Sequence, residues 1–359
     1  MKYKIFTAAF VLLCILPSAG MLFLPPTRPA ANERLAPVPR LYTEEGALNP
    51  NVLDEVTNYI ADHFALRQEM VTANAALHTA LLHTAPAEDV IYGKDGWLYY
   101  AATLDDYQNR QTLSEDDLHA IARTVAEMQA FCEARGAQFL FTIAPNKNSL
   151  YPENMPARYL KENAAGNYEH LRPLLDEYGV RYADLFAFFE GQDEVLYLET
   201  DSHWTNRGAA LAHDFLMDAL ALPHTRFAEA AYTESPSHRG DLYEMLYPKG
   251  AFHEMQQAYQ TTYTYDTPPR SAEDILMQTT QPAAPNGRLI LCRDSFDNAL
   301  HPFLAEDFRT AVITRQMPYP LTQVQAGDTV IVEIVERNLG NLLKYPPDLG
   351  NQTVSDSVE

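Results

Sequence analysis

The chain has 359 residues, of which 47% are hydrophobic and 21% are charged, a composition able to bury the core of one large domain or two modest ones. Its formal net charge is −22, from 26 basic and 48 acidic side chains. Because phosphate groups are bound by clustered Lys and Arg, this balance argues against a nucleic-acid partner. Three cysteines do not make a disulfide framework, and no internal repeat is visible.

The first 26 residues are expected to be a targeting segment. Lys2 and Lys4 precede an uncharged, largely apolar run over residues 5–24. Such a run is either a cleaved signal peptide or a single membrane anchor, and both interpretations place the rest of the chain outside the cytoplasmic membrane. The small residues at 17–20 suit a cleavage site, whereas the apolar residues at 21–24 favour an anchor.

Residues 27–50 are rich in proline, alanine and polar side chains and are predicted to form a linker. Residues 51–88 follow as a helical stem with a loose apolar face. A hairpin is expected over 90–100, where β-forming residues flank a Lys-Asp-Gly turn. Ser114 and Asp117 have the spacing of a capping box, and apolar residues at helical spacing then predict a helix that Gly136 stops.

The remainder alternates short apolar runs with stretches of helical periodicity. The expected strands are 138–144, 180–185, 289–292, 311–314 and 329–335, and the expected helices are 168–178, 205–220 and 296–308. This alternation predicts a three-layer α/β domain over 89–345 with a mostly parallel sheet. The polar residues 346–359 are expected to be disordered.

Ser295 lies between an expected strand and an expected helix, in the stretch RLILCRDSFDNALHPFL. A strand-to-helix turn lifts a hydroxyl clear of the sheet and leaves backbone N–H groups free for a developing oxyanion. On its own this position has a simpler explanation, because a serine there is often only a helix cap.

Asp201 and His203 lie two residues apart in the stretch YLETDSHWTNRGA, ahead of another expected helix. A serine nucleophile needs a base, since its hydroxyl is almost wholly protonated at its free pKa. His203 would take the proton, and Asp201 would orient the imidazole. The pair could equally cap the helix, while Trp204 could hold the loop from beneath or belong to the core.

Ligands of open parallel sheets bind beyond the carboxyl ends of the strands. Several polar side chains are expected there and are candidates for holding the oxyanion or the substrate: Asn146, Lys147, Asn148, Arg293 and Arg315. No HExxH or CxxC pattern is present, so no metal site is predicted. The absence of a glycine-rich phosphate loop argues against a nucleotide, and no cofactor is expected.

Five blocks of the chain together resemble the DHHW family, which is related to SGNH-hydrolase-like proteins of the AlgX and AlgJ type. These blocks are YGKDGWLYY, APNKNSLYPENMP, DSHW followed by TNRGA, GDLYEML and LCRDSFDNALHPFLAEDF. They occur in the family's order over roughly residues 50–345, which is more specific than any one motif. The resemblance implies an SGNH-like, flavodoxin-like α/β fold.

The resemblance also implies a triad of Asp201, His203 and Ser295. Ser202 stands where the family name has a first histidine, which leaves the expected base intact. Arg293 stands where many SGNH enzymes have a glycine and could supply positive charge near the oxyanion or face outward. The backbone N–H of Ser295 is the first choice for the oxyanion hole.

By this resemblance the chain is expected to be an extracytoplasmic serine O-acetyltransferase or esterase that modifies a carbohydrate polymer through an acyl-serine. A membrane-bound O-acyltransferase would be its partner, by family analogy. The alternative is a non-enzymatic protein of the same fold that binds polysaccharide or scaffolds an export complex. Transfer and hydrolysis differ only in whether sugar or water reaches the acyl-enzyme.

Overall fold

A seven-stranded sheet forms the centre of the protein in the computed structural model, which describes residues 2–21, 23–24, 29, 34–110, 112–162 and 165–350. The sheet order is β4 (Tyr182–Ala183), β3 (Gln138–Ala144), β11 (Thr329–Val335), β9 (Asn286–Cys292), β10 (Phe308–Thr314), β8 (Leu276–Thr280) and β7 (Thr264–Tyr265). The five strands from β4 to β10 run parallel, and β8 and β7 add an antiparallel edge. The predicted mostly parallel sheet is therefore confirmed.

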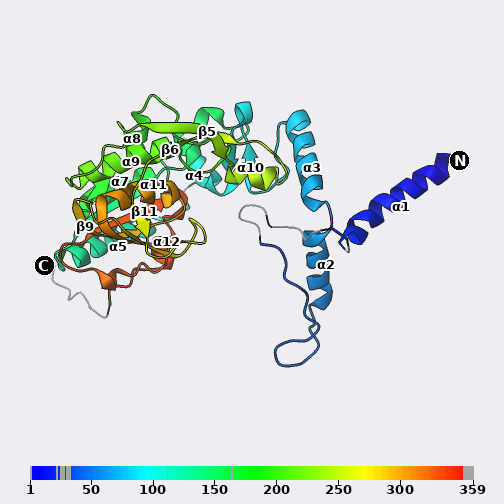
Figure 1. The fold of residues 1–359 in the computed structure, drawn as a ribbon, viewed down its shortest axis with the longest axis horizontal. Helices are drawn as coiled ribbons and strands as arrows, with labels where there is room; N and C mark the ends of the chain where they lie inside the picture. Colours follow the sequence, from blue (N-terminus) through cyan, green and yellow to red (C-terminus); the bar gives the residue numbers. More distant parts are fainter. Residues whose placement is uncertain are drawn as a thin grey trace.

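Helices cover both faces of this sheet (Figure 1). One face packs against α5 (Glu115–Glu133), α7 (Asn167–Glu177) and the short α12 (Asn341–Lys344). The other packs against α8 (Leu185–Glu190), α9 (Asn206–Ala219) and α11 (Asp297–Asp307). Every residue of β11 is buried, as a strand covered on both faces requires, and this explains its β-branched, nearly continuous apolar sequence.

Local signals in the sequence correspond to the observed element ends. Ser114 and Asp117 form the expected capping box of α5, and Gly136 follows that helix with a positive φ of 77°. The expected hairpin is formed by β1 (Val90–Tyr92) and β2 (Leu98–Tyr100), which pair antiparallel. The short helix α4 (Leu104–Tyr107) follows, and α6 (Lys147–Leu150) comes directly after β3.

A second hairpin was not predicted. Strands β5 (Tyr232–His238) and β6 (Glu254–Tyr259) pair antiparallel, with the short helix α10 (Asp241–Leu246) between them. Most of β5 is exposed and polar, so it lacks the apolar alternation by which a half-buried strand is recognised. This unit lies at the carboxyl ends of the parallel strands and contributes to the candidate site described below.

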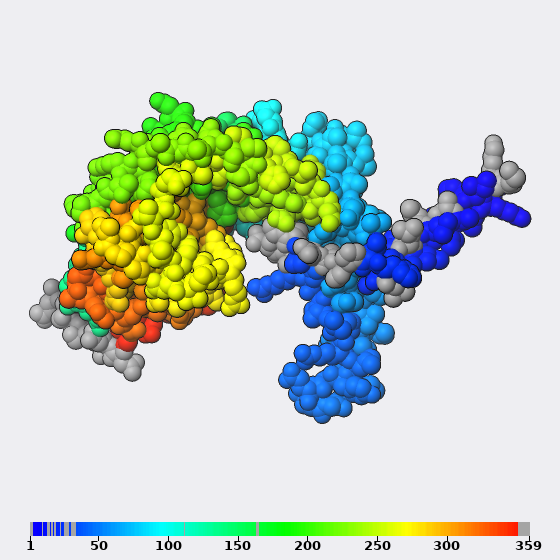
Figure 2. Space-filling model, viewed as in Figure 1, coloured from blue at the N-terminus to red at the C-terminus, as the bar shows by residue number. Residues whose placement is uncertain are grey.

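The N-terminal helices α1 (Lys2–Gly20), α2 (Val52–His63) and α3 (Arg67–Leu82) project from one side of the α/β body (Figures 1 and 2). Helix α3 is attached through Ala75, which packs with residues of β1, β2 and α10, and through Thr79, whose hydroxyl lies 2.8 Å from that of Tyr247. The expected helical stem thus packs on the main domain, beside α10.

Among the residues described, no helix has both the length and the apolar character needed to cross a membrane. The targeting segment expected over residues 1–26 stays a prediction, as do the domain boundaries. Part of the expected linker, from 27 to 33 except residue 29, lies outside the described residues, and so does the end of the expected tail, 351–359.

Candidate active site

Ser295 lies in the turn between β9 and α11, as the sequence predicts. The turn is pinned to the end of β11 by Asp294, whose Oδ2 accepts hydrogen bonds from the backbone N–H of Val335 (2.7 Å) and from the Asn338 side chain (3.1 Å). The other carboxylate oxygen of Asp294 accepts the N–H of Phe296 (3.0 Å). The carboxylate that follows the strand therefore shapes the turn, and the Ser295 hydroxyl is left for other contacts.

Asp201 and His203 lie in a tight loop before α9. Oδ1 of Asp201 accepts both the backbone N–H of His203 (2.9 Å) and a hydrogen bond with its ring Nδ1 (2.7 Å). The loop is closed by the backbone bond from Leu198 N–H to the His203 carbonyl (3.1 Å), and Thr205 caps α9 by accepting the N–H of Gly208 (2.9 Å). Thr205, and not the Asp201–His203 pair, therefore carries the capping function.

The structure brings these two segments together. Nε2 of His203 lies 2.9 Å from Oγ of Ser295, so one imidazole joins the carboxylate of Asp201 to the hydroxyl of Ser295. Trp204 and Phe296, the residues that follow His203 and Ser295, pack edge to face at 5.2 Å between ring centroids and fasten the two segments to each other. This is the geometry of a serine nucleophile with a histidine base and an orienting carboxylate.

The charges of the site support this arrangement. Burial disfavours ionisation of Asp201, but the imidazoles of His203 and His238 outweigh it and hold the pKa of this carboxyl well below its usual value. Burial likewise lowers the pKa of His203, and the attraction of Asp201 overcomes it, so the pKa of the imidazole is raised. The ionised carboxylate therefore makes His203 a stronger base.

A cleft of about 580 Å³ opens at Ser295 and His203. Its lining comes from loops beyond the carboxyl ends of the parallel strands, from the end of β2 and from the start of α10. The lining residues are Tyr100, Ala102, Ser202, His203, Asp241, Glu273, Ser295, Arg315, Arg337 and Asn338. Within the described chain, the backbone N–H of Ser295 has no hydrogen-bond acceptor, which leaves it available to an oxyanion.

The structure places three candidates beyond β3, at the start of α6, away from the cleft. Lys147 is buried, and its ammonium donates to the carbonyls of Leu198, Glu199 and Asp201 at 3.0, 3.0 and 2.5 Å. It braces the Asp201 loop from behind, because a buried ammonium needs acceptors on several sides.

Asn146 and Asn148 are also fully buried and do not line the cleft. The Asn146 amide donates to Asp106 (3.1 Å), and the Asn148 amide donates to the Thr103 hydroxyl (2.8 Å). Both side chains tie the loop after β3 to the segment that follows β2. An oxyanion or a substrate in the cleft does not meet them.

Arg293 is buried as well, so it neither lines the cleft near the oxyanion nor faces outward. Its guanidinium donates to the carbonyl of Ala272 (2.6 Å) and the side chain of Asn298 (2.6 Å), which anchors the segment before β8 to α11. Trp204 is a packing residue beneath the loop. Of the candidates outside the triad, Arg315 lines the cleft, where it forms an ion pair with Glu273.

Polar residues beyond the predicted candidates also belong to the site. Ser202, Arg337 and Asn338 line the cleft, and Asp241 does so at the start of α10. His238 at the end of β5 donates to Asp201 from Nε2 (2.8 Å). Asp241 lies in the GDLYEML block, which was a usable signal, whereas nothing local distinguishes His238 or Arg337 from surface residues.

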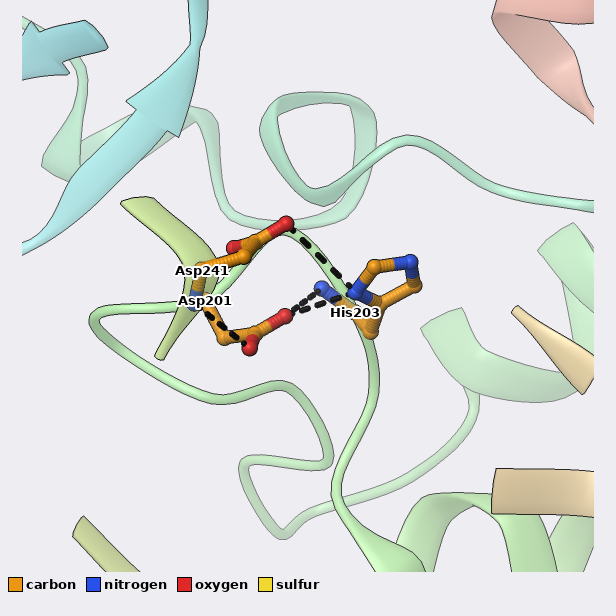
Figure 3. A group of neighbouring side chains, drawn as sticks. All are labelled: Asp201, His203 and Asp241. Atoms are coloured by element: carbon orange, nitrogen blue, oxygen red, sulfur yellow. Dashed lines mark hydrogen bonds and ion pairs between the residues drawn. The ribbon is translucent and has the colours of Figure 1, made fainter. Parts of the chain in front are cut away.

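Three potential metal ligands come together in this part of the described chain: one ligand atom each from Asp201, His203 and Asp241, all within 4.8 Å of one another (Figure 3). Hydrogen bonds already engage the same atoms. Both oxygens of Asp201 accept N–H groups, and the Asp241 carboxylate accepts the N–H and hydroxyl of Ser202. These three side chains therefore fit a hydrogen-bonded network better than a set of metal ligands.

Fold and site together define an SGNH-like α/β protein with a serine, a histidine and a carboxylate in line. The chain belongs to the family described as SGNH hydrolase-like domain, acetyltransferase AlgX, whose model matches residues 90–313. The resemblance seen in the sequence is thereby confirmed.

Its relatives include proteins named probable alginate O-acetylase AlgJ. That of Pseudomonas syringae pv. tomato is 28% identical over 180 residues, which cover 50% of this chain and 45% of the relative. That of Azotobacter vinelandii is 25% identical over 237 residues, 61% of this chain and 59% of the relative. The chain thus spans about half the length of the curated relatives it matches.

Solved structures share the fold. A DHHW family protein from Eubacterium siraeum aligns with a TM-score of 0.51 at 16% identity, over 70% of this chain and 91% of that one. Bacillus cereus PatB1, solved with a sulfonyl adduct, aligns with a TM-score of 0.52 at 15% identity, over 70% and 95%. The SGNH-like fold class is thus confirmed by structures with little sequence identity to this chain.

Proposed function

We propose that this protein is a serine-dependent O-acetyltransferase or esterase that acts on an exported or cell-surface polysaccharide through an acyl-serine intermediate. One observation carries the proposal: the continuous hydrogen-bond chain from Asp201 Oδ1 through His203 to Ser295 Oγ, at 2.7 and 2.9 Å, at the edge of an open cleft.

In the first half of the proposed reaction, Ser295 Oγ attacks the carbonyl carbon of an acetyl donor while His203 Nε2 takes the hydroxyl proton. The N–H of Ser295 stabilises the oxyanion that forms. The C–O bond to the donor then breaks, and His203 returns the proton to the leaving oxygen. Acetyl-Ser295 and the deacetylated donor alcohol remain.

In the second half, a sugar hydroxyl gives its proton to His203 and attacks the acetyl-serine carbonyl. Collapse of the tetrahedral intermediate breaks the bond to Ser295 Oγ, which recovers the proton from His203. The products are an O-acetylated sugar and the free enzyme. Water in place of the sugar gives acetate, so the same site performs transfer or hydrolysis according to which acceptor reaches it.

The family and its relatives support acetyl transfer, and the relatives' name suggests an alginate-like polymer as substrate. The cleft lining offers the guanidinium group of Arg337 to an acidic sugar, whereas that of Arg315 is paired with Glu273.

The proposal includes a location outside the cytoplasmic membrane, based on the basic and apolar residues of the first 26 positions. It also includes a membrane-bound O-acyltransferase as the partner that delivers acetyl groups. This partner is proposed from family analogy alone.

The test compares the full chain with its Ser295→Ala variant, using an activated acetyl ester as donor and an alginate-like polymer as acceptor. We expect turnover to fall by about 10⁴-fold or more, and an acetyl group to be found by mass spectrometry on Ser295 of the parent only. Ser235→Ala, which changes an exposed serine on β5, is the matched control and should keep full activity.

Wild-type turnover by Ser295→Ala would contradict the proposal. A fluorophosphonate probe supplies a second reading, because it labels an activated serine. Polysaccharide binding without labelling of Ser295 would favour the non-enzymatic alternative, a binding module of the same fold.

A further inference from the structure

The imidazole of His203 faces two carboxylates, and only one of them belongs to the proposed triad. Oδ2 of Asp241 lies 3.8 Å from Nδ1 of His203 (Figure 3), whereas Ser295 contacts the other ring nitrogen, Nε2. Asp241 begins α10, a segment 38 to 40 positions beyond the Asp201–His203 loop. Its position therefore depends on the packing of a separate unit against that loop.

Ser202 links the second carboxylate to the imidazole. Its backbone N–H donates to Asp241 Oδ1 (2.8 Å) and its hydroxyl donates to Asp241 Oδ2 (2.7 Å). With its proton directed to Asp241, the Ser202 oxygen turns a lone pair toward Nδ1 of His203, 3.2 Å away.

Nδ1 of His203 consequently meets three oxygens that accept: Asp201 Oδ1, Ser202 Oγ and Asp241 Oδ2. A neutral imidazole carries one proton, and three acceptors around Nδ1 place it there. Nε2 then has only a lone pair, which is the state needed to accept the proton of Ser295.

Asp241 also holds the first carboxylate. Its backbone N–H donates to Oδ2 of Asp201 (2.9 Å), and His238 donates to the same oxygen (2.8 Å). Asp201 Oδ1 is thereby left to His203 alone. The segment from His238 to Asp241 therefore holds both Asp201 and Ser202, which contact Nδ1 of His203.

We propose that Asp241 is a positioning residue: through Ser202 and through its own negative charge it holds His203 in the tautomer that accepts from Ser295 and strengthens it as a base. The catalytic consequence rests on the proposed function, but the effect on the imidazole does not.

The charged groups around His203 come from four segments. Asp201 lies on the same loop, Asp241 on α10 and Arg337 after β11, while His238 on β5 acts through Asp201. The two carboxylates favour the imidazolium and Arg337 opposes it, so loss of the Asp241 charge shifts the balance toward the neutral ring.

The experiment uses the folded full chain and its Asp241→Asn variant. The His203 ring is titrated by NMR, and kcat/KM for the acetyl ester is measured against pH. We expect the pKa of His203 to fall by about half to one unit, the acid limb of the kcat/KM profile to move by the same amount, and the plateau rate to drop about tenfold.

Two further variants separate charge from structure. Glu244→Gln removes the same charge one turn along α10, outside the cleft lining. It should leave the pKa of His203 and the kcat/KM profile unchanged. Ser202→Ala keeps the Asp241 charge but removes the bridge, so the rate should fall while the acid limb stays in place. If Asp241→Asn does not fold, Asp241→Ser, which is smaller and uncharged, carries the same test.

An unchanged His203 pKa in the Asp241 variant would overturn the inference, even if the rate falls. The NMR titration reads the imidazole whether or not the chain turns over an ester. Failure of this inference is therefore distinct from failure of the proposed function, which depends on Ser295→Ala.

Discussion

The ring nitrogen Nε2 of His203 and the hydroxyl of Ser295 lie 2.9 Å apart, although 92 positions separate the two residues in the chain. Strand β9 delivers Ser295 to the edge of the sheet, and the loop ahead of α9 delivers His203. Packing of α9 against α11 brings the two together, because Trp204 and Phe296 meet edge to face between them. The hydrophobic contact between Trp204 and Phe296 thus sets the distance between His203 and Ser295.

The orienting carboxylate can be tested by Asp201→Asn. An amide accepts through only one atom, so it cannot receive the His203 ring and both donors on the other side as the carboxylate does. We expect kcat for acetyl-ester turnover to fall by about 10⁴-fold, with the fold intact by circular dichroism. A kcat within tenfold of the parent would count against Asp201 as the orienting group.

Under the proposed function, the pH dependence of the parent chain follows from the raised pKa of His203. The base must be neutral, and it becomes protonated as the pH falls through its pKa, which lies above the ordinary value of 6.5. We therefore expect kcat/KM to decline about tenfold per pH unit on the acid side of that value. A profile that stays flat down to about pH 5.5 would exclude His203 as the base.

Lys147 is predicted to stabilise the loop that carries Asp201 and His203 from behind. Lys147→Met removes the donor for three backbone carbonyls, those of Leu198, Glu199 and Asp201. Buried acceptors without donors are costly, so the free energy of unfolding should fall by about 2–4 kcal/mol in chemical denaturation. Lys344→Met, at an exposed position, should change it by less than about 0.5 kcal/mol. Equal stability of the two variants would refute this role.

Gly240 allows the segment before α10 to approach the loop of Asp201. A Cβ at this position would lie 2.2 Å from the carbonyl oxygen of Thr200, so the two backbones would have to move apart. Gly240→Ala should destabilise the fold by about 1–3 kcal/mol and lower activity with it. Gly191→Ala is the control, since its Cβ would meet only ordinary contacts at 3.5 Å. Unchanged melting of the Gly240 variant would disprove the close approach.

Glu336 gives a stability prediction away from the proposed chemistry. Burial and the nearby Asp106 raise its pKa to about 8. Because the folded state holds the proton more tightly than the unfolded one, this group's contribution to stability is complete below about pH 4.5 and is lost as the pH rises to about 8.

Glu336→Gln keeps an oxygen to accept from Asn146 and Ser149 but has no charge to bury. We expect its melting temperature at pH 8 to exceed that of the parent by about 2–5 °C, with the difference vanishing near pH 4.5. Thermal scans at both pH values test this, and an equal gain at both would contradict the titration of Glu336.

Much of the sheet could be predicted because its signal is local. Strand β11 has a nearly continuous run of β-branched residues, and α5 has its cap and its apolar periodicity within twenty residues. The exposed β5 strand carries no such pattern and was missed. Among the site residues, Asp201 and His203 form a pair that is visible in four consecutive letters, and Ser295 stands at a recognisable turn.

The sequence by itself therefore determined the mostly parallel sheet, the Asp201–His203 pair and the turn at Ser295, since each depends on neighbours in the chain. Only the tertiary structure decided which polar residues at the strand ends reach the cleft. Lys147 and Arg293 turn inward because backbone carbonyls around them need donors, whereas Asp241 and Arg337 enter the cleft from distant segments. Burial and hydrogen-bond satisfaction are properties of the folded whole, and no local pattern of residues encodes them.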